Sequence, residues 1–143
     1  MPFSNLLPAE TDSPEATQAL GRALAARLRP GDVIALHGGL GAGKTHLAKG
    51  VAEGLGIDPD TVTSPTFTLI HEHDDGHLLH LDLYRIETPA EAARLGIAEL
   101  LSGDAVALVE WPEHSFGALP PDTVHLMLVP LGGDRRRVEL RES

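Results

Sequence analysis

The chain has 143 residues, 42% of them hydrophobic, which is enough for one folded domain with a buried core and excludes global disorder. It contains no cysteine, so disulfide scaffolds and zinc sites built on thiolates are excluded. Its formal net charge of −10 argues against direct binding of nucleic acid, because that task needs a basic surface to neutralise phosphates.

Targeting signals are not visible in the sequence. No apolar run approaches the ~20 residues that span a bilayer. The N-terminal stretch MPFSNLLPAE lacks the basic flank and the apolar length of a signal peptide. We therefore expect a cytoplasmic protein that forms a single domain over residues 1–143, with no membrane or DNA partner.

The first third of the chain predicts a helix, a strand and a second helix. Ser13-Pro14-Glu15 is typical of a helix start, with a capping hydroxyl, a proline in the first turn and a carboxylate at the positive helix end. Pro30-Gly31 ends this helix, and the apolar run 33–36 indicates a strand buried on both faces. A glycine-rich segment follows, and the second helix ends near Gly54 and Gly56. Apolar residues at helical spacing predict the buried stripes of the two helices: Leu20, Leu24 and Leu28 in the first, and Leu47, Val51 and Leu55 in the second.

The middle of the chain predicts a β-hairpin and a capped helix. Residues 66–69 alternate polar and apolar types, 74–76 form a turn, and 78–83 return as the second strand. Thr88 and Pro89 begin a capping box, and the helix that follows is interrupted at Gly96.

The last third predicts strands. The run 105–109 is typical of a buried strand, and 124–129 with 137–140 predict two closing strands joined by a turn at Gly132-Gly133. Together these elements favour a three-layer α/β domain of the P-loop type. Its mixed sheet would have a parallel centre, an antiparallel hairpin and the closing strands.

The segment 38–45 reads GGLGAGKT and satisfies G-x-x-x-x-G-K-[ST] at every fixed position. Its glycines permit a backbone that turns successive N–H groups inward as a nest for anionic oxygens. In this motif Lys44 reaches the β- and γ-phosphates of a nucleotide, and the Thr45 hydroxyl binds Mg²⁺. We expect the Lys44 side chain to extend into solvent when no nucleotide is bound. A glycine-rich turn without a ligand fits less well, because the segment lies between a strand and a helix as the motif requires.

Two carboxylates follow predicted strands. Asp82 ends the run 78–81, and Glu110 ends the run 105–109. Ligands of α/β sheets bind at the carboxyl ends of strands, and a phosphate loop needs an acidic partner for Mg²⁺ or its waters. Both residues are therefore predicted to complete a metal and hydrolysis site, and which of them binds the metal directly stays open. The alternative for each is a solvated charge at a strand end.

Other polar and aromatic residues leave alternatives open. Tyr84 and Trp111 lie within two positions of the two carboxylates and fit either the core or the rim of a site. Four histidines fall in the hairpin region (His71, His73, His77 and His80), where a solvated hairpin is favoured over a transition-metal site. The cluster Arg135–Arg137 fits a phosphate contact or a solvated strand edge equally well.

Several segments together resemble one family. GGLGAGKT is followed in order by SPTFTL at 64–69, HLDLYR at 80–85, LGIAELL at 95–101 and ALVEWPE at 107–113. The chain resembles, over nearly its whole length, the TsaE family of YjeE-type P-loop ATPases, which take part in the bacterial biosynthesis of threonylcarbamoyladenosine in tRNA. The loop alone is unspecific, whereas the later segments in this order are quite specific.

The resemblance implies a set of roles. Lys44 and Thr45 match the family's phosphate and Mg²⁺ contacts, and Asp82 and Glu110 match its metal-site and hydrolysis carboxylates. The segment 64–68 matches a nucleotide-sensing switch. The residues expected to contact ATP are Gly38, Gly39, Leu40, Gly41, Ala42, Gly43, Lys44, Thr45, His46, Trp111 and Arg136.

The resemblance also implies partners. A TsaB–TsaD complex would transfer the threonylcarbamoyl group to the adenosine next to the anticodon, and ATP hydrolysis by this subunit would reset that complex. The tRNA would be contacted only through the partners. Two departures, Gly39 for a usual Asp and His46 for a usual Thr, remove no required phosphate ligand.

Two other functions use the same loop. A small-molecule or nucleoside kinase needs a mobile lid that carries arginines, and no insertion of lid length is visible in the sequence. A nucleotide-gated binding module with negligible hydrolysis cannot be separated from a slow ATPase by sequence.

Overall fold

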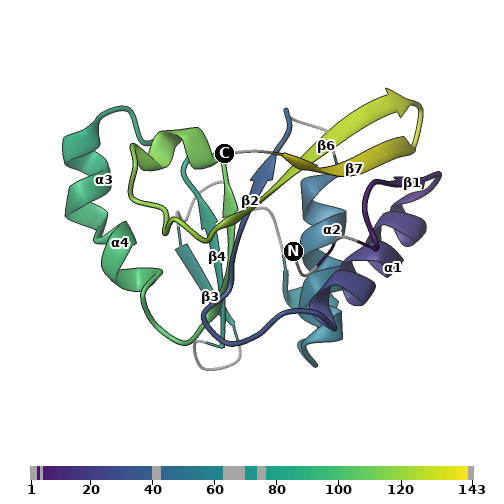
Figure 1. The fold of residues 1–143 in the computed structure, drawn as a ribbon, viewed down its shortest axis with the longest axis horizontal. Helices are drawn as coiled ribbons and strands as arrows, with labels where there is room; N and C mark the ends of the chain where they lie inside the picture. Colours follow the sequence, from purple (N-terminus) through teal and green to yellow (C-terminus); the bar gives the residue numbers. More distant parts are fainter. Residues whose placement is uncertain (1–2, 4, 40–42, 63–69, 74–76, 142–143) are drawn as a thin grey trace. The chain divides into compact units, whose positions relative to one another are not determined.

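We describe the protein from a computed structural model, which describes residues 3, 5–39, 43–62, 70–73 and 77–141. The chain folds as two compact parts, and each is treated by itself. The first part consists of residues 1–28, 38–64 and 126–143, and the second of residues 29–37 and 65–125. Figure 1 shows the chain coloured along its sequence. The prediction of one domain over residues 1–143 stays a prediction.

The helices of the first part begin where the sequence predicts. Helix α1 (Pro14–Ala25) is capped by Ser13, whose hydroxyl accepts a hydrogen bond from the Ala16 backbone N–H at 3.0 Å. Helix α2 (Lys44–Gly54) directly follows the glycine-rich segment, and the short 3₁₀ helix η1 (Pro59–Thr61) comes after it. The predicted stripe of α1 needs correction. Leu24 is buried, whereas Leu20 and Leu28 are only half-buried, because the buried face also uses small residues.

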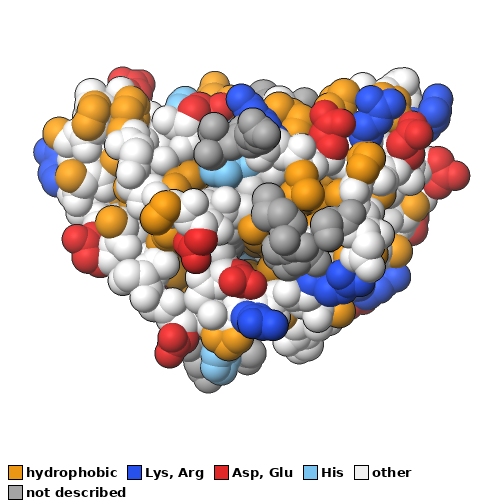
Figure 2. Space-filling model, viewed as in Figure 1, with side chains coloured by type: hydrophobic (Ala, Val, Ile, Leu, Met, Phe, Trp, Pro, Cys, Tyr) orange, Lys and Arg blue, Asp and Glu red, His pale blue; other side chains and the backbone are white. Residues whose placement is uncertain are grey.

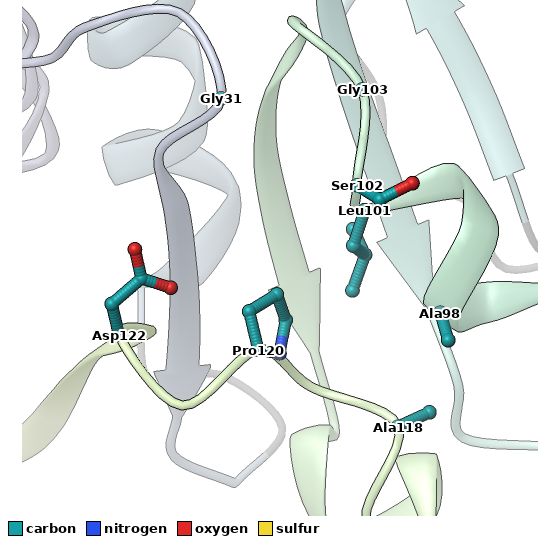
Figure 3. Close-up of a pocket in the computed structure, with 8 residues that line it drawn as sticks. All are labelled: Gly31, Ala98, Leu101, Ser102, Gly103, Ala118, Pro120 and Asp122. Atoms are coloured by element: carbon teal, nitrogen blue, oxygen red, sulfur yellow. The ribbon is translucent and has the colours of Figure 1, made fainter.

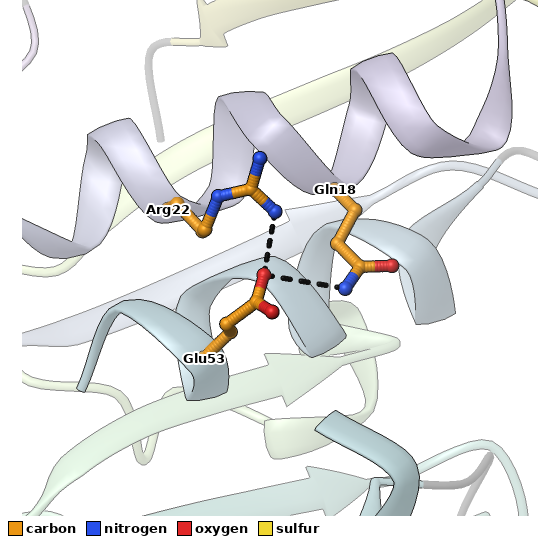
Figure 4. Close-up of polar contacts among 3 residues, drawn as sticks. All are labelled: Gln18, Arg22 and Glu53. Carbon is orange, nitrogen blue, oxygen red and sulfur yellow. Dashed lines mark hydrogen bonds and ion pairs between the residues drawn. The ribbon is translucent and has the colours of Figure 1, made fainter. Parts of the chain in front are cut away.

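Those small residues let α1 and α2 pack closely, side by side (Figure 1). Gly21 of α1 lies against Gly50 of α2, and a Cβ atom at either glycine would meet the backbone of the other helix. At the edge of this contact Glu53 accepts hydrogen bonds from Arg22, at 2.5 Å, and from Gln18, at 3.3 Å (Figure 4). The Arg22 guanidinium is the main cause of a lowered pKa at Glu53. This pairing is exposed, so it adds little to stability compared with the glycine contact.

The strands of the first part are antiparallel neighbours in the order β1-β7-β6. Their bounds are β1 (Ala9–Thr11), β6 (Val124–Gly132, whose first two residues belong to the second part) and β7 (Arg135–Arg141). Gly133, at φ 55, lies in the turn between β6 and β7. Thr11 of β1 is also joined to Thr17 of α1 by a buried hydroxyl–hydroxyl hydrogen bond of 2.7 Å.

The second part is built on four strands in the order β2-β5-β4-β3. The strands are β2 (Val33–His37), β3 (Ile70–His73), β4 (Leu78–Asp82) and β5 (Val106–Glu110). β2, β5 and β4 are parallel, and β3 pairs antiparallel with β4. The predicted mixed α/β sheet, with a parallel centre and an antiparallel hairpin, is confirmed.

One face of this sheet carries a hydrophobic core. Helices α3 (Pro89–Leu95) and α4 (Ile97–Leu100) pack against it, and the 3₁₀ helix η2 (Pro112–Ser115) follows β5 (Figure 1). The core contains Val33, Leu79, Leu81, Leu83, Ile86, Ala92, Ile97, Leu101, Ala107 and Val109. Thr88 caps α3 through the Glu91 backbone N–H, at 3.2 Å, as the predicted capping box requires. Because side chains alternate along a strand, the opposite face carries the second set of residues from β2, β4 and β5.

One strand prediction is not tested, and two others differ from the structure. The strand predicted at 66–69 lies outside the described residues. The closing strands are longer than predicted, and β1 was not predicted at all. Among the described helices, none has the length and apolar character needed to cross a membrane.

Candidate functional site

The glycine-rich segment directly follows the carboxyl end of β2. His37 is the last residue of the strand, and Gly38 is the next residue of the chain. Gly38, Gly39 and Gly43 are described, whereas the predicted ATP contacts Leu40, Gly41 and Ala42 lie outside the described residues. The motif therefore occupies the position that a phosphate loop requires, between a buried parallel strand and the first turn of a helix.

The N-terminus of α2 differs from those of α1 and α3. Gly43 is the N-cap of α2, with φ 98, a left-handed conformation that favours glycine. It offers no side-chain acceptor to the helix, and the first turn of α2 contains no acidic residue. In α1 and α3, by contrast, Ser13 and Thr88 cap the backbone N–H groups. The first turn of α2 thus places no carboxylate at the positive end of the helix, and this suits an anionic ligand.

The three residues after Gly43 differ in how far they are exposed to solvent. The Lys44 side chain is buried, with 6% exposed, so the expectation that it extends into solvent was wrong. A lysine side chain is almost never fully buried unless it is paired with another group. The Lys44 side chain is thus enclosed by the protein instead of extending into solvent. Thr45 is half-buried, and His46 is exposed.

Arg136 of β7 lies against the same glycine. A Cβ atom placed on Gly43 would lie 3.6 Å from Arg136 Nε and 3.7 Å from its Cγ. The guanidinium donates hydrogen bonds to the carbonyl oxygens of Gly133, at 2.7 Å, and Arg135, at 2.8 Å. The turn between β6 and β7 therefore holds this cation beside the start of α2. Arg136 thus lies beside the N-terminus of α2, and its predicted contact with ATP stays a prediction.

The second part places the two predicted carboxylates side by side. Asp82 is the last residue of β4 and Glu110 the last residue of β5, and the two are direct partners in the parallel register. Leu36 of β2 pairs with Glu110 on the other side. Both carboxylates are buried, with 8% of Asp82 and 4% of Glu110 exposed. They lie at the carboxyl edge of the three parallel strands, at the end of β2 from which the glycine-rich segment continues.

Each carboxylate is oriented by a hydrogen bond from another residue of the second part. The Tyr84 backbone N–H donates to Asp82 Oδ1 at 2.9 Å. His80 Nε2 lies 2.5 Å from Glu110 Oε2. The sequence indicates His80 only as one of several hairpin histidines, and this contact was not predicted. The spacing of His80 and Asp82, two residues apart on one strand, would have indicated that both lie on one face.

Trp111 lies next to Glu110 but packs differently. Its indole packs against the hydrophobic core on the α3 and α4 face, and its ring centroid is 5.0 Å from that of Tyr84. Its backbone is left-handed, at φ 55, which is uncommon for a bulky residue and marks a sharp change of direction after β5. Tyr84 is half-exposed (53%), so it fits the rim of a site better than the core, whereas Trp111 packs against the core. The predicted contact of Trp111 with ATP stays a prediction.

The hairpin histidines do not form a metal site within the described residues, where no group of three or more potential ligands is placed to hold an ion. His71 and His73 of β3 share a face, with ring centroids 6.1 Å apart. Burial lowers the pKa of His73, and electrostatic interactions with His80 and His71 lower it further.

A separate pocket of about 460 Å³ lies elsewhere in the second part (Figure 3). It lies where β2 and β5 begin, and its lining includes Gly31, Gly103 and Leu101. Among the described residues, Asp122 is its one ionisable lining residue. This pocket contains none of the predicted site residues and does not bear on the chemistry proposed below.

Known proteins match the chain over most of its length. The family model described as Threonylcarbamoyl adenosine biosynthesis protein TsaE matches residues 11–138. A relative from Bacillus subtilis (strain 168), described as tRNA threonylcarbamoyladenosine biosynthesis protein TsaE, is 45% identical over 130 residues, which are 90% of this chain and 80% of that protein. A relative of the same description from Streptomyces coelicolor is 40% identical over 119 residues, 80% of each chain.

A solved structure has the same fold. The crystal structure of YdiB from Bacillus subtilis matches with a TM-score of 0.74 and 38% identity, over 94% of this chain and 83% of that one. With the glycine-rich loop, the paired carboxylates and the mixed sheet in place, these matches show that the chain belongs to the TsaE family of threonylcarbamoyl adenosine biosynthesis proteins.

Proposed function

We propose that this chain is a cytoplasmic P-loop ATPase that assists a TsaB–TsaD complex in the threonylcarbamoyl modification of tRNA. The observation that carries the proposal is the shared edge of β2, β4 and β5. From this edge the strands present Asp82 and Glu110 in register, and β2 continues directly into the glycine-rich loop. A phosphate loop and an acidic strand end are the two parts from which P-loop enzymes build their magnesium-nucleotide sites.

The residues of the first part suit a bound polyphosphate. The backbone N–H groups at the start of α2 and the Lys44 ammonium would bind phosphate oxygens, and Arg136 supplies a further cation beside Gly43. The left-handed backbone of Gly43, at φ 98, explains why this position has no side chain of its own. Each charge-assisted hydrogen bond of this kind is worth about 1.5–3 kcal/mol.

The donor set suits magnesium. The Thr45 hydroxyl and the carboxylates of Asp82 and Glu110 are oxygen ligands, which Mg²⁺ prefers over nitrogen and sulfur. The metal, when bound with ATP, would neutralise charge on the phosphates and polarise the γ-phosphoryl group. In this proposal Thr45 and Asp82 hold the metal, Glu110 orients a water or the metal, and Lys44 stabilises the charge that develops on the γ-phosphate.

The charge of the chain supports an indirect contact with tRNA. Eleven basic residues stand against twenty-one acidic ones. On the described residues of the face shown in Figure 2, basic side chains lie in small groups beside acidic ones. A surface of this kind neutralises few phosphates, so partners would hold the tRNA.

Phosphate release from ATP by the purified chain tests the proposal, measured alone, with tRNA, with TsaB–TsaD, and with all of these together. We expect slow hydrolysis by the chain alone, no change on adding tRNA, and a clear change on adding TsaB–TsaD. Tight, salt-sensitive tRNA binding by the isolated chain would contradict the proposal. Transfer of the phosphate to a small molecule instead of water would favour a kinase, and ATP binding without hydrolysis under every condition would favour a nucleotide-gated binding module.

A further inference from the structure

His80 is a buried polar residue among apolar ones. It lies in the middle of β4, between Leu79 and Leu81, and its side chain is only 1% exposed. Because side chains alternate along the strand, His80 lies on the same face as Asp82 and away from the hydrophobic core that contains its two neighbours. A leucine would satisfy the burial of this position without any polar atom to pair. The presence of an imidazole therefore needs a reason other than packing.

The imidazole has one hydrogen-bond partner in the described part of the chain. Its Nε2 lies 2.5 Å from Glu110 Oε2, and both side chains are buried. Its Nδ1 is also buried and makes no hydrogen bond to the described residues. A carboxylate accepts hydrogen bonds, so the proton lies on Nε2 and the ring donates it to Glu110. The bond to Glu110 is thus the polar contact that fixes the orientation of the ring.

The register explains why this contact forms. Asp82 pairs with Glu110, and His80 pairs with Leu108, the residue two positions before Glu110 on β5. His80 and Glu110 are therefore diagonal neighbours on one face of two adjacent parallel strands. Asp82 lies on the same face but accepts its hydrogen bond from a different donor, the Tyr84 backbone N–H. Separate hydrogen-bond donors thus orient the two carboxylates.

We propose that His80 is the positioning residue of Glu110. Its Nε2–H holds Oε2 in one place and thereby fixes the direction in which the carboxylate points before any ligand arrives. The inference rests on the proposed function, in which Glu110 orients a water or the metal. Outer partners that orient a functional side chain typically contribute about 10- to 100-fold to activity when they are removed.

Three substitutions separate positioning from packing. His80→Gln keeps an N–H donor at the same number of bonds from Cα as Nε2. His80→Asn keeps a polar amide that is too short to reach Glu110, and His80→Leu removes the donor while retaining apolar bulk. We expect kcat for ATP hydrolysis to fall about 10- to 100-fold in His80→Leu and in His80→Asn, and to recover most of that loss in His80→Gln. ATP affinity should stay within about twofold in all three, because no contact to the phosphates is removed.

A double-substitution cycle links the effect to Glu110. In a Glu110→Ala background, His80→Leu should lower kcat no further, because the residue that it positions is already absent. Additive losses in kcat, or an equal loss in His80→Gln and His80→Leu, would overturn the proposal. Thermal unfolding of every variant shows which of them are folded.

A measurement without ATP keeps the inference separate from the proposed function. The ring ¹⁵N resonances of His80 in the nucleotide-free chain should report a protonated Nε2, and Glu110→Ala should shift the Nε2 resonance. The opposite tautomer, or no response to Glu110→Ala, would overturn the positioning role. If instead the ring behaves as expected while the wild-type chain with TsaB–TsaD hydrolyses no ATP, then the proposed function fails and the His80–Glu110 contact stands.

Discussion

Gly21 of α1 and Gly50 of α2 pack backbone against backbone. A Cβ atom on Gly50 would lie 2.9 Å from the Cα of Gly21 and 2.0 Å from the carbonyl oxygen of Gln18. Contacts this short leave no room for a methyl group unless one helix moves. Since α2 begins at Lys44, this contact also fixes the helix that carries the motif lysine.

Gly50→Ala should therefore destabilise the protein. Alanine favours a helix over glycine by about 1 kcal/mol, but overpacking against rigid backbone costs about 1–3 kcal/mol or more, so the steric term wins. Urea unfolding measures the difference. Gly103→Ala is the matched control, because its Cβ would meet no atom closer than 3.8 Å. A Gly50→Ala protein at least as stable as the wild type would show that the two helices separate easily.

Lys44→Ala should weaken ATP binding, and Lys49→Ala should not. These are the only lysines of the chain, and both lie on α2. Loss of a charge-assisted hydrogen bond worth about 1.5–3 kcal/mol corresponds to a rise in Kd of roughly 10- to 150-fold. Because Lys44 is buried, its removal also changes packing, so a thermal unfolding curve accompanies each titration. Equal affinity in the two variants would remove Lys44 from the phosphate site.

Asp82→Asn and Glu110→Gln should each lower Mg²⁺-dependent hydrolysis by roughly a hundredfold or more, the scale for loss of a charge-stabilising group. Their effects should not add, since the two side chains are register partners and act on one site. Phosphate release at saturating Mg²⁺ measures both. Glu113→Gln, an exposed carboxylate three residues after Glu110, should keep wild-type activity. Fully additive losses would show that Asp82 and Glu110 act independently and not on one site.

Stability should fall as the pH drops below about 6.5, in part because of His73. Burial lowers the pKa of His73 in the folded chain, so the unfolded chain binds its proton first. The stability contributed by neutral His73 is thus complete above the unfolded pKa and decreases until the pH reaches the lower folded pKa. His73→Gln should flatten the pH dependence of urea unfolding, whereas His77→Gln, at an exposed position, should leave it unchanged. Parallel profiles for wild type and His73→Gln would contradict this assignment.

Local chemistry made much of the fold predictable. Ser13 and Thr88 identify helix starts because a hydroxyl at the N-cap satisfies a backbone N–H that the helix leaves unpaired. The apolar run that becomes β5 predicts a buried parallel strand, and Glu110 marks its end. The motif GGLGAGKT places Lys44 at the start of a helix, where the structure has it.

Features that depend on contacts between residues far apart in the sequence could not be predicted. The strand β1 has three residues and no periodicity, so only its pairing with β7 makes it a strand. The buried face of α1 includes Gly21 because α2 approaches there, which the spacing of leucines cannot indicate. The contact between His80 and Glu110 depends on the register of β4 with β5, and no local pattern in either strand contains that information.

The alignment of Leu36, Asp82 and Glu110 across β2, β4 and β5 constrains how the lengths of these strands can change in evolution. One residue inserted within β5 would rotate Glu110 to the face that holds Val109 and bring a different residue opposite Asp82. A residue added before Val106, outside the paired segment, would leave the alignment intact. Homologous chains should therefore vary in length at the amino-terminal ends of these strands and keep a constant number of residues between the paired segments and their carboxylates.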